Sequence, residues 1–228
     1  YRWGETGGNE GQLDGPSGLA LDEDGNLAVV DHQNHRVQRF TPDGGFISCF
    51  GSKGVEDGCF NLPWGVATDP RGAIYVADWG NDRVQKLSVD GEVLGRYGVP
   101  GRGDGEFHRP ADVAVDKDGY IYVADWGNHR VQVLGSDGGF VMKLRGEATE
   151  SRWARDFLDI NLEEAAARAE SDLEPDVPFA RDDPHEESSH IEKYFWAPTS
   201  VKLDDEGSLY VTESNRHRVQ VYRRVQNA

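Results

Sequence analysis

The chain is built from repeats of 47 residues, and this period limits the folds that are open to it. Three segments align without a gap, namely 15–40, 62–87 and 109–134. One position of the repeat therefore holds Pro16, Pro63 and Pro110. A fourth copy, 197–222, begins 88 residues after the third, so 41 extra residues precede it. A period of about 40–50 residues is typical of the blades of a β-propeller.

Each repeat shows the pattern of four short strands. In the second copy, runs rich in β-branched and aromatic residues alternate with Gly- and Asn-containing turns; these runs are 65–69, 74–78, 83–87 and 93–97. One such sheet leaves both faces uncovered, so the copies must stack around an axis. The sequence predicts an all-β propeller of four-stranded antiparallel blades in a single domain, 1–228. Its parts are an outer strand 1–4, blades 15–50, 62–97 and 109–145, an insertion 146–196 and a last blade 197–222.

The motif P-x-G-V-A-x-D followed by I-Y-V-A-D-x-x-N-x-R-V-Q, in residues 63–85, resembles the NHL repeat. The resemblance is to prokaryotic NHL-repeat proteins and to the NHL domain of tripartite-motif proteins. It implies a propeller, usually of six blades. With four copies, two arrangements stay open: a ring of four in which residues 1–4 complete the last blade, or a piece of a longer array. The missing initiator Met favours the piece.

The charge is strongly acidic and unevenly spread. The chain has 41 acidic and 24 basic residues, a net charge of −17, and residues 146–196 hold 15 of the acidic against 5 of the basic ones. Nucleic-acid binding needs Lys and Arg that neutralise phosphates, so the composition disfavours a nucleic-acid partner. No apolar stretch is long enough to cross a membrane. The composition leaves the compartment open.

The insertion breaks the β pattern. Ser151 is placed to cap a helix that contains Trp153 and Phe157, and Asn161 with Glu164 forms a second capping box before an Ala-rich amphipathic stretch. Two short helices are expected to lie on the ring with Trp153 and Phe157 facing inward. A proline- and acid-rich stretch then predicts an extended loop up to the last blade.

Strand direction puts the unusual segments on one side, which we call the loop face. It carries the turns 32–35, 79–82, 126–129 and 214–217, the connectors between blades, and the insertion. Loops on a rigid scaffold are where binding groups are found. Departures from the repeat predict a mouth for a protein, peptide or carbohydrate ligand, formed by Trp64, Trp79, His108, Arg109, Asp112, Trp126 and Trp196.

Other polar residues recur in every blade, and recurrence argues for a structural network rather than for catalysis. They are Asp31, Asn34, Arg36, Asp78, Asn81, Arg83, Asp125, Asn128, Arg130, Glu213 and Arg218. Three histidines in equivalent turns, His35, His129 and His217, are expected to be solvated, because neighbouring blades hold them too far apart to share a metal ion. The sequence predicts no catalytic residue, metal or cofactor.

The two cysteines, Cys49 and Cys59, occupy positions that hold Arg96 and Glu106 one period later. If the outer strand and the following connector touch there, the thiols can form a disulfide in an oxidising compartment. Otherwise both are free.

Three functions compete: a non-catalytic binding scaffold, a metal-dependent propeller enzyme of the amidating-lyase or lactonase type, and an RNA-binding NHL domain. The resemblance implies that amidating lyases hold zinc with histidines near the axis. The four expected inner strands of this chain contain no His. The sequence therefore favours the binding scaffold.

Overall fold

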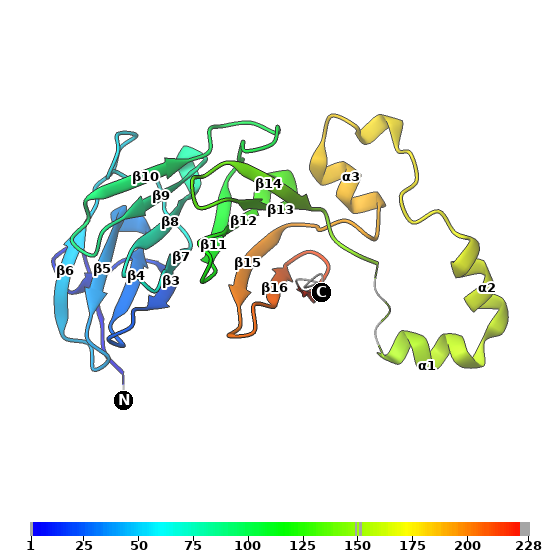
Figure 1. Cartoon of the computed structure of the whole chain (residues 1–228), viewed down its shortest axis with the longest axis horizontal. Coiled ribbons are helices and arrows are strands. Elements are labelled where there is room, and N and C mark those ends of the chain that lie inside the picture. The colour runs from blue at the N-terminus through cyan, green and yellow to red at the C-terminus, as the bar shows by residue number, and fades with distance from the viewer. Residues whose placement is uncertain (1, 149, 151, 224–228) are drawn as a thin grey trace.

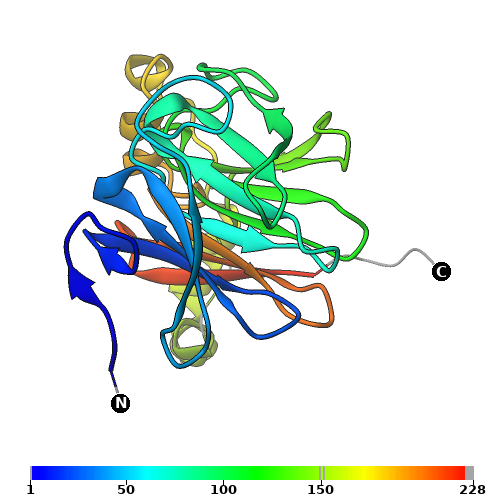
Figure 2. The same cartoon turned by 90° about the vertical axis from the view of Figure 1, so that its left-hand side faces the viewer.

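The computed structural model describes residues 2–148, 150 and 152–223, except for the side chains of Arg152 and Trp153. Three antiparallel four-stranded sheets and one of three strands follow in chain order (Figures 1 and 2). Blade 1 contains β3 (Pro16–Leu21), β4 (Leu27–Asp31), β5 (Arg36–Phe40) and β6 (Phe46–Phe50); blade 2 contains β7 (Val66–Thr68), β8 (Ile74–Asp78), β9 (Arg83–Leu87) and β10 (Val93–Tyr97). Blade 3 contains β11 (Pro110–Val115), β12 (Ile121–Asp125), β13 (Arg130–Leu134) and β14 (Phe140–Leu144); blade 4 contains β15 (Pro198–Leu203), β16 (Leu209–Glu213) and β17 (Arg218–Tyr222). The predicted fold class is confirmed.

A side-chain turn joins the first two strands of each blade. Asp69 Oδ1 accepts hydrogen bonds from the backbone N–H groups of Arg71 and Ala73, both at 2.9 Å. Gly72 then takes a left-handed φ of 82°. Asp204 and Gly207 repeat the arrangement in blade 4. The Asp-x-x-Gly pattern thus sets the hairpin register of every blade.

The core lies between the blades. Val30 and Val37, on one face of blade 1, pack against Val66 and Val76 of blade 2, and all four are fully buried. The equivalent faces of blades 2 and 3 pack together in the same way, and so do those of blades 3 and 4. We call these contacts the first, second and third junctions. Each blade therefore uses one face toward the preceding blade and the other toward the following blade.

The amino-terminal residues pack on blade 1. The ring of Trp3 lies 4.9 Å from that of Phe40, and it fills the space beside Gly44, as Phe50 does beside Gly91 in the next blade. Residues 2–4 form no strand, and β1 (Glu5–Thr6) pairs only with β2 (Gln12–Leu13). Within the described residues, the sheet of blade 4 takes no strand from this segment. The described residues therefore do not form the closed ring of four, one of the two alternatives.

The insertion contains α1 (Arg152–Ile160), α2 (Leu162–Glu170), a short 3-10 turn η4 (Pro178–Ala180) and α3 (Pro184–His190). The first two helices pair with each other and project away from the blades (Figure 1). The expectation that they lie on the ring is wrong, because α1 and α2, as far as the structure describes them, contact each other and not the blades (Figure 1); Phe157 stays 44% exposed. The side chain of Trp153 lies outside the described residues.

A third helix, α3, replaces part of the predicted loop. The carboxylate of Asp183 accepts from the N–H groups of His185 and Glu186, and Pro184 occupies the first helical position. Proline is favoured there, because its missing N–H has no partner inside a helix anyway. None of the helices in the described part of the chain is long and apolar enough to span a membrane.

Candidate binding face

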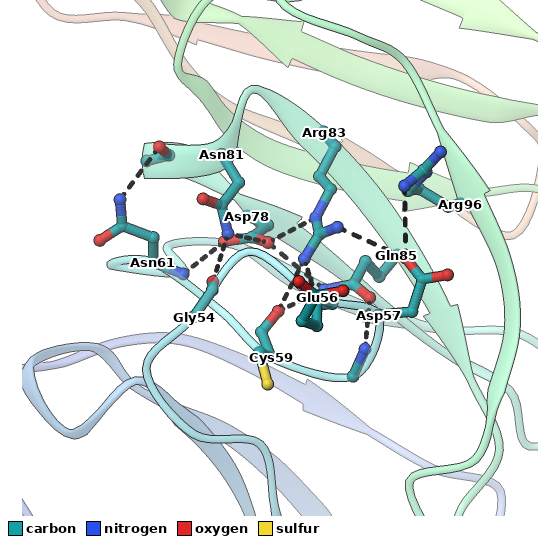
Figure 3. A network of polar contacts seen from close by, with 12 residues as sticks. Gly54, Glu56, Asp57, Cys59, Asn61, Asp78, Asn81, Arg83, Gln85 and Arg96 are labelled. Carbon is teal, nitrogen blue, oxygen red and sulfur yellow. Dashed lines mark hydrogen bonds and ion pairs between the residues drawn. The ribbon is translucent and has the colours of Figure 1, made fainter.

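A buried carboxylate organises each blade, as Figure 3 shows for Asp78 in blade 2. Its Oδ2 accepts from Arg83 Nε and Asn81 Nδ2, both at 2.8 Å, and from Gln85 Nε2 at 3.3 Å. Its Oδ1 accepts from the N–H of Asn61 at 2.7 Å. Burial raises the pKa of Asp78, and these hydrogen bonds together with the Arg83 charge oppose that rise. The structure thus brings the predicted Asp, Asn and Arg together.

The same side chains reach the connector that enters the blade. Asn81 Nδ2 donates to the carbonyl of Gly54 at 2.9 Å, and Arg83 Nη2 donates to those of Glu56 and Cys59. Gln85 donates to the Cys59 carbonyl at 2.7 Å. The network therefore fixes the loops as well as the hairpin, which is more than a cross-strand pair does. Sequence reasoning missed the glutamine, although a V-Q pair follows the arginine in every repeat.

Every blade repeats this network. The Nε-to-carboxylate distance is 2.8 Å for Arg36 with Asp31 and for Arg130 with Asp125, and 2.5 Å for Arg218 with Glu213. Asn34 and Asn128 make the same two contacts as Asn81, and the glutamines are Gln38, Gln132 and Gln220. In blade 4, Arg216 stands where the others have Asn and donates to carbonyls of the insertion. These residues form a rigid frame under the loop face.

The second junction places four polar and aromatic side chains on the loop face. The Arg109 guanidinium lies over the Trp79 ring, 4.7 Å from its centroid. Asp82 Oδ1 accepts from the backbone N–H of Arg109 at 2.6 Å and lies 3.6 Å from His108 Nδ1. The His108 side chain is 49% exposed. Three of the predicted ligand-binding residues, Trp79, His108 and Arg109, are therefore gathered in one accessible cluster.

Two of the three turn histidines are held in hydrogen bonds rather than solvated, contrary to the expectation; the third, His217, is exposed as expected. His35 Nδ1 accepts from the N–H of Leu62 at 3.0 Å, and His129 Nδ1 accepts from the N–H of Ala197 at 2.9 Å. Both pairs of residues have positive φ angles, as do Asp82 and Arg109. The hydrogen bond latches one blade to the next and stabilises a strained backbone on both sides. In the second junction, Asp82 occupies the position of these histidines and accepts from the N–H of Arg109. This hydrogen bond therefore requires an acceptor at that position, but not a histidine.

Trp64 lies apart from that cluster, at the first junction. Its ring meets His32 edge-on at 4.8 Å, and it is 43% exposed. His32 Nδ1 lies 2.9 Å from the carbonyl of Pro63, which accepts from it. The contact with His32 fixes the orientation of the Trp64 ring on the loop face.

Asp112 joins two inner strands. Its Oδ2 accepts from Ser200 Oγ at 2.6 Å and from the N–H of Val201 at 3.1 Å, and lies 3.1 Å from Lys202 Nζ. Asp112 is only 5% exposed. Gly65 lies against it, where an added Cβ would come within 2.4 Å of its Oδ1. The carboxylate is thus placed to hold β11 against β15.

Trp126 and Trp196 belong to the third junction, which α3 covers. Trp126 lies in η3 (Trp126–Asn128), and α3 contacts that turn. Trp196 Nε1 donates to His185 Nδ1 at 3.2 Å. The contacts among described residues therefore assign the predicted ligand-binding residues to three junctions and the inner strands rather than to a single mouth.

Both cysteines are free. Cys49 Sγ lies 4.0 Å from Oε1 of Glu10. The equivalent pairs in the next two repeats are ion pairs, namely Arg96 with Asp57 and Lys143 with Asp104. The outer strand therefore contacts an acidic residue of the connector, and not the position of Cys59. Of the two alternatives, the disulfide is wrong in this structure.

An apolar hollow lies away from the loop face. It has a volume of about 410 Å³ and lies between blades 3 and 4, where Tyr122, Met142, Leu144, Leu209 and Tyr222 are among its lining residues. No group of three His, Cys, Asp or Glu side chains among the described residues is placed to hold a metal ion.

Comparison with known proteins identifies the repeat and the fold. A model of the NHL repeat matches residues 13–40, 60–87, 107–134 and 195–222. No curated protein matches the sequence.

Solved structures match over most of the chain. A structure titled Streptogramin B lyase is 16% identical with a TM-score of 0.54, and the match covers 91% of this chain and 54% of that one. A Nidogen/Laminin complex is 20% identical with a TM-score of 0.56, at 92% and 59% coverage. A virginiamycin B lyase from Staphylococcus aureus is 12% identical with a TM-score of 0.52, at 90% and 54%. The chain spans little more than half of each, and this likeness shows the fold alone.

Proposed function

Because the chain belongs to the NHL-repeat proteins, we propose that it is a non-catalytic scaffold whose loop face binds a protein partner. The second junction is the centre of the proposed site, and Trp79, His108 and Arg109 are its contact residues. Trp64 extends the surface toward the first junction.

The accessible cluster of Trp79 and Arg109 carries this proposal. Trp and Arg are enriched among the residues that dominate the energy of protein interfaces. The Arg109 backbone is held by Asp82, and its guanidinium is already stacked on the indole. Little side-chain entropy is therefore lost when a partner binds, which favours affinity.

The stacked pair favours a protein over a carbohydrate. A sugar ring is commonly held against an open aromatic face, and Arg109 occupies one face of Trp79. Among the matched structures, the Nidogen/Laminin complex is itself an assembly of two proteins. The lyase names belong to those proteins, and β3, β7, β11 and β15 of this chain carry no His.

The test selects binders from a displayed library of random peptides and measures their affinity for the chain. Arg109→Glu is expected to weaken selected peptides by about 30-fold, the size of an interface hot spot of about 2 kcal/mol. Arg71→Glu, in an exposed turn between the first two strands of blade 2, is the matched control. Equal losses for both variants would contradict the proposed site. A glycan array that binds while no peptide does would favour the carbohydrate alternative.

A further inference from the structure

The loop face has one covered junction and one open junction of the same construction. At the third junction, α3 rests on η3 and Asn128 is buried. At the second junction, the equivalent turn η2 (Trp79–Asn81) leaves Asn81 partly exposed. The insertion therefore packs on the turn that contains Trp126, whereas no helix in the described part of the chain makes a comparable contact with the turn that contains Trp79.

Two imidazoles lie at the contact between α3 and the blades. His129 Nδ1 accepts from the N–H of Ala197, and His185 Nδ1 accepts from Trp196 Nε1. The ring centroids are 5.1 Å apart. A protonated imidazole carries N–H on both nitrogens and accepts no hydrogen bond. Protonation of either ring thus breaks its own bond, and protonation of both places two positive charges side by side.

Of the surrounding charges, that of Asp183 favours protonated His129 and that of Arg145 disfavours it. Arg145 forms an ion pair with Glu187 and stacks on Tyr194, and Arg216 donates to the carbonyls of Ser188 and Ile191. Asp183 is engaged in capping α3. On the outer side of α3, Glu186 pairs with His190 at 3.1 Å.

The buried ring resists protonation. Burial, followed by the charges of His185 and Arg145, lowers the pKa of His129 to about 4, and Asp183 opposes this shift. Docking of α3 therefore favours the neutral ring. By linkage, protonation of the ring disfavours docking to the same extent.

We propose that α3 is an acid-released lid over the third junction of the loop face. While His129 and His185 are neutral, α3 is docked. When both are protonated, it leaves and uncovers Trp126 and Trp196. The consequence that acid enlarges the partner-binding surface rests on the proposed function, whereas the release itself does not.

The experiment follows hydrogen exchange in the full chain at pH 7.5 and pH 4.5, corrected for the intrinsic effect of pH. Protection of residues 184–190 is expected to fall at least ten-fold at the lower pH, while β8 stays protected. The double variant His129→Asn and His185→Asn keeps side-chain acceptors without titrating, so it is expected to stay protected at both values. His185→Lys places a fixed charge beside His129 and is expected to release α3 at pH 7.5.

Unchanged protection of residues 184–190 in the native chain at pH 4.5 would overturn the lid. Loss of protection in β8 to the same extent would also overturn it, since that is global unfolding. An equal loss in the double Asn variant would show that the imidazoles are not responsible. None of these readouts uses a partner, so failure of the lid is distinguishable from failure of the proposed binding site.

Discussion

At the scale of residues, each blade contains a buried carboxylate under the loop face that needs several hydrogen-bond donors to offset its desolvation. Asp78 is fully buried and is satisfied by Arg83, Asn81, Gln85 and a backbone N–H. Removal of one partner leaves a buried charge without compensation. Stability should therefore depend on the arginine far more than its single ion pair suggests.

Arg83→Ala is expected to lower the free energy of unfolding by about 3–5 kcal/mol. Arg96→Ala is the matched control, because Arg96 pairs with Asp57 at 3.5 Å in a solvent-exposed setting (Figure 3). Such a pair contributes ~0.5 kcal/mol. Urea denaturation of both variants measures the difference. Similar losses in the two would mean that the buried network does not support the blade.

The sequence allowed part of this network to be predicted. The period placed the Asp, Asn and Arg together, because their spacing within each hairpin is constant. It did not show that Gln85 and the connector carbonyls complete the site, since those contacts depend on where the connector passes. The latch of His129 on Ala197 was missed for the same reason, because it joins residues 68 positions apart across the insertion.

His129 also predicts a pH dependence of stability. Its pKa is lowered by burial, then by His185, to about 4 from an ordinary value of 6.5. The unfolded chain therefore binds a proton that the folded chain does not bind between those values. The free energy of unfolding should fall as pH drops through this window, by up to about 1.4 kcal/mol per pH unit. Denaturation at pH 7 and pH 5.5 should show a steeper fall in the native chain than in His129→Asn, and equal falls would exclude this ring as the cause.

At the scale of elements, the three helices of the insertion play different parts. The helices α1 and α2 contact each other, whereas α3 contacts η3 and its Ser188 carbonyl accepts from Arg216, in the turn between β16 and β17 of blade 4. Sequence patterns located α1 and α2, although Asn161 makes no side-chain capping hydrogen bond to α2, and the predicted cap Ser151 lies outside the described residues. They missed α3, because its prolines resembled the breakers of a loop, although Asp183 followed by Pro184 is a favourable helix start.

Replacement of residues 152–173 by a short Gly-Ser linker is expected to leave the melting temperature of the blades nearly unchanged, because these helices bury little of the β-sheet surface. Replacement of 184–190 is expected to lower it by several degrees, since it removes the Arg145–Glu187 pair and the cover over His129. Calorimetry of the two variants compares them. A larger fall for the first replacement would show that the projecting helices support the fold.

At the scale of the whole molecule, the arc of blades ends in two apolar faces. Leu19 is 58% exposed, whereas its repeat equivalents Val66, Val113 and Val201 are fully buried. At the other end, Val219 is 57% exposed, and Val37, Val84 and Val131 are fully buried. The faces of Leu19 and Val219 are the two halves of a blade junction, as the packing of Val66 against Val37 shows.

The 228-residue polypeptide, purified by itself, is expected to associate head to tail through these faces, since large exposed apolar patches mark interaction surfaces. Light scattering should give a mass that rises with concentration above the 25.3 kDa of one chain. Leu19→Asp and Val219→Asp should each weaken this association at least ten-fold, because each places a charge in an apolar junction. Val55→Asp, at an exposed connector position, should have no effect.

A mixture of the two weakened variants distinguishes a specific contact between the two end faces from non-specific hydrophobic association. Leu19→Asp keeps an intact face at Val219, and Val219→Asp keeps one at Leu19. The mixture should therefore form a single good contact and yield a two-chain species that neither variant forms alone. Such a species follows only if the contact joins unlike faces, because a like-with-like contact would survive in one of the two variants by itself. A mixture that remains monomeric would show that the end faces do not recognise each other as the internal blades do.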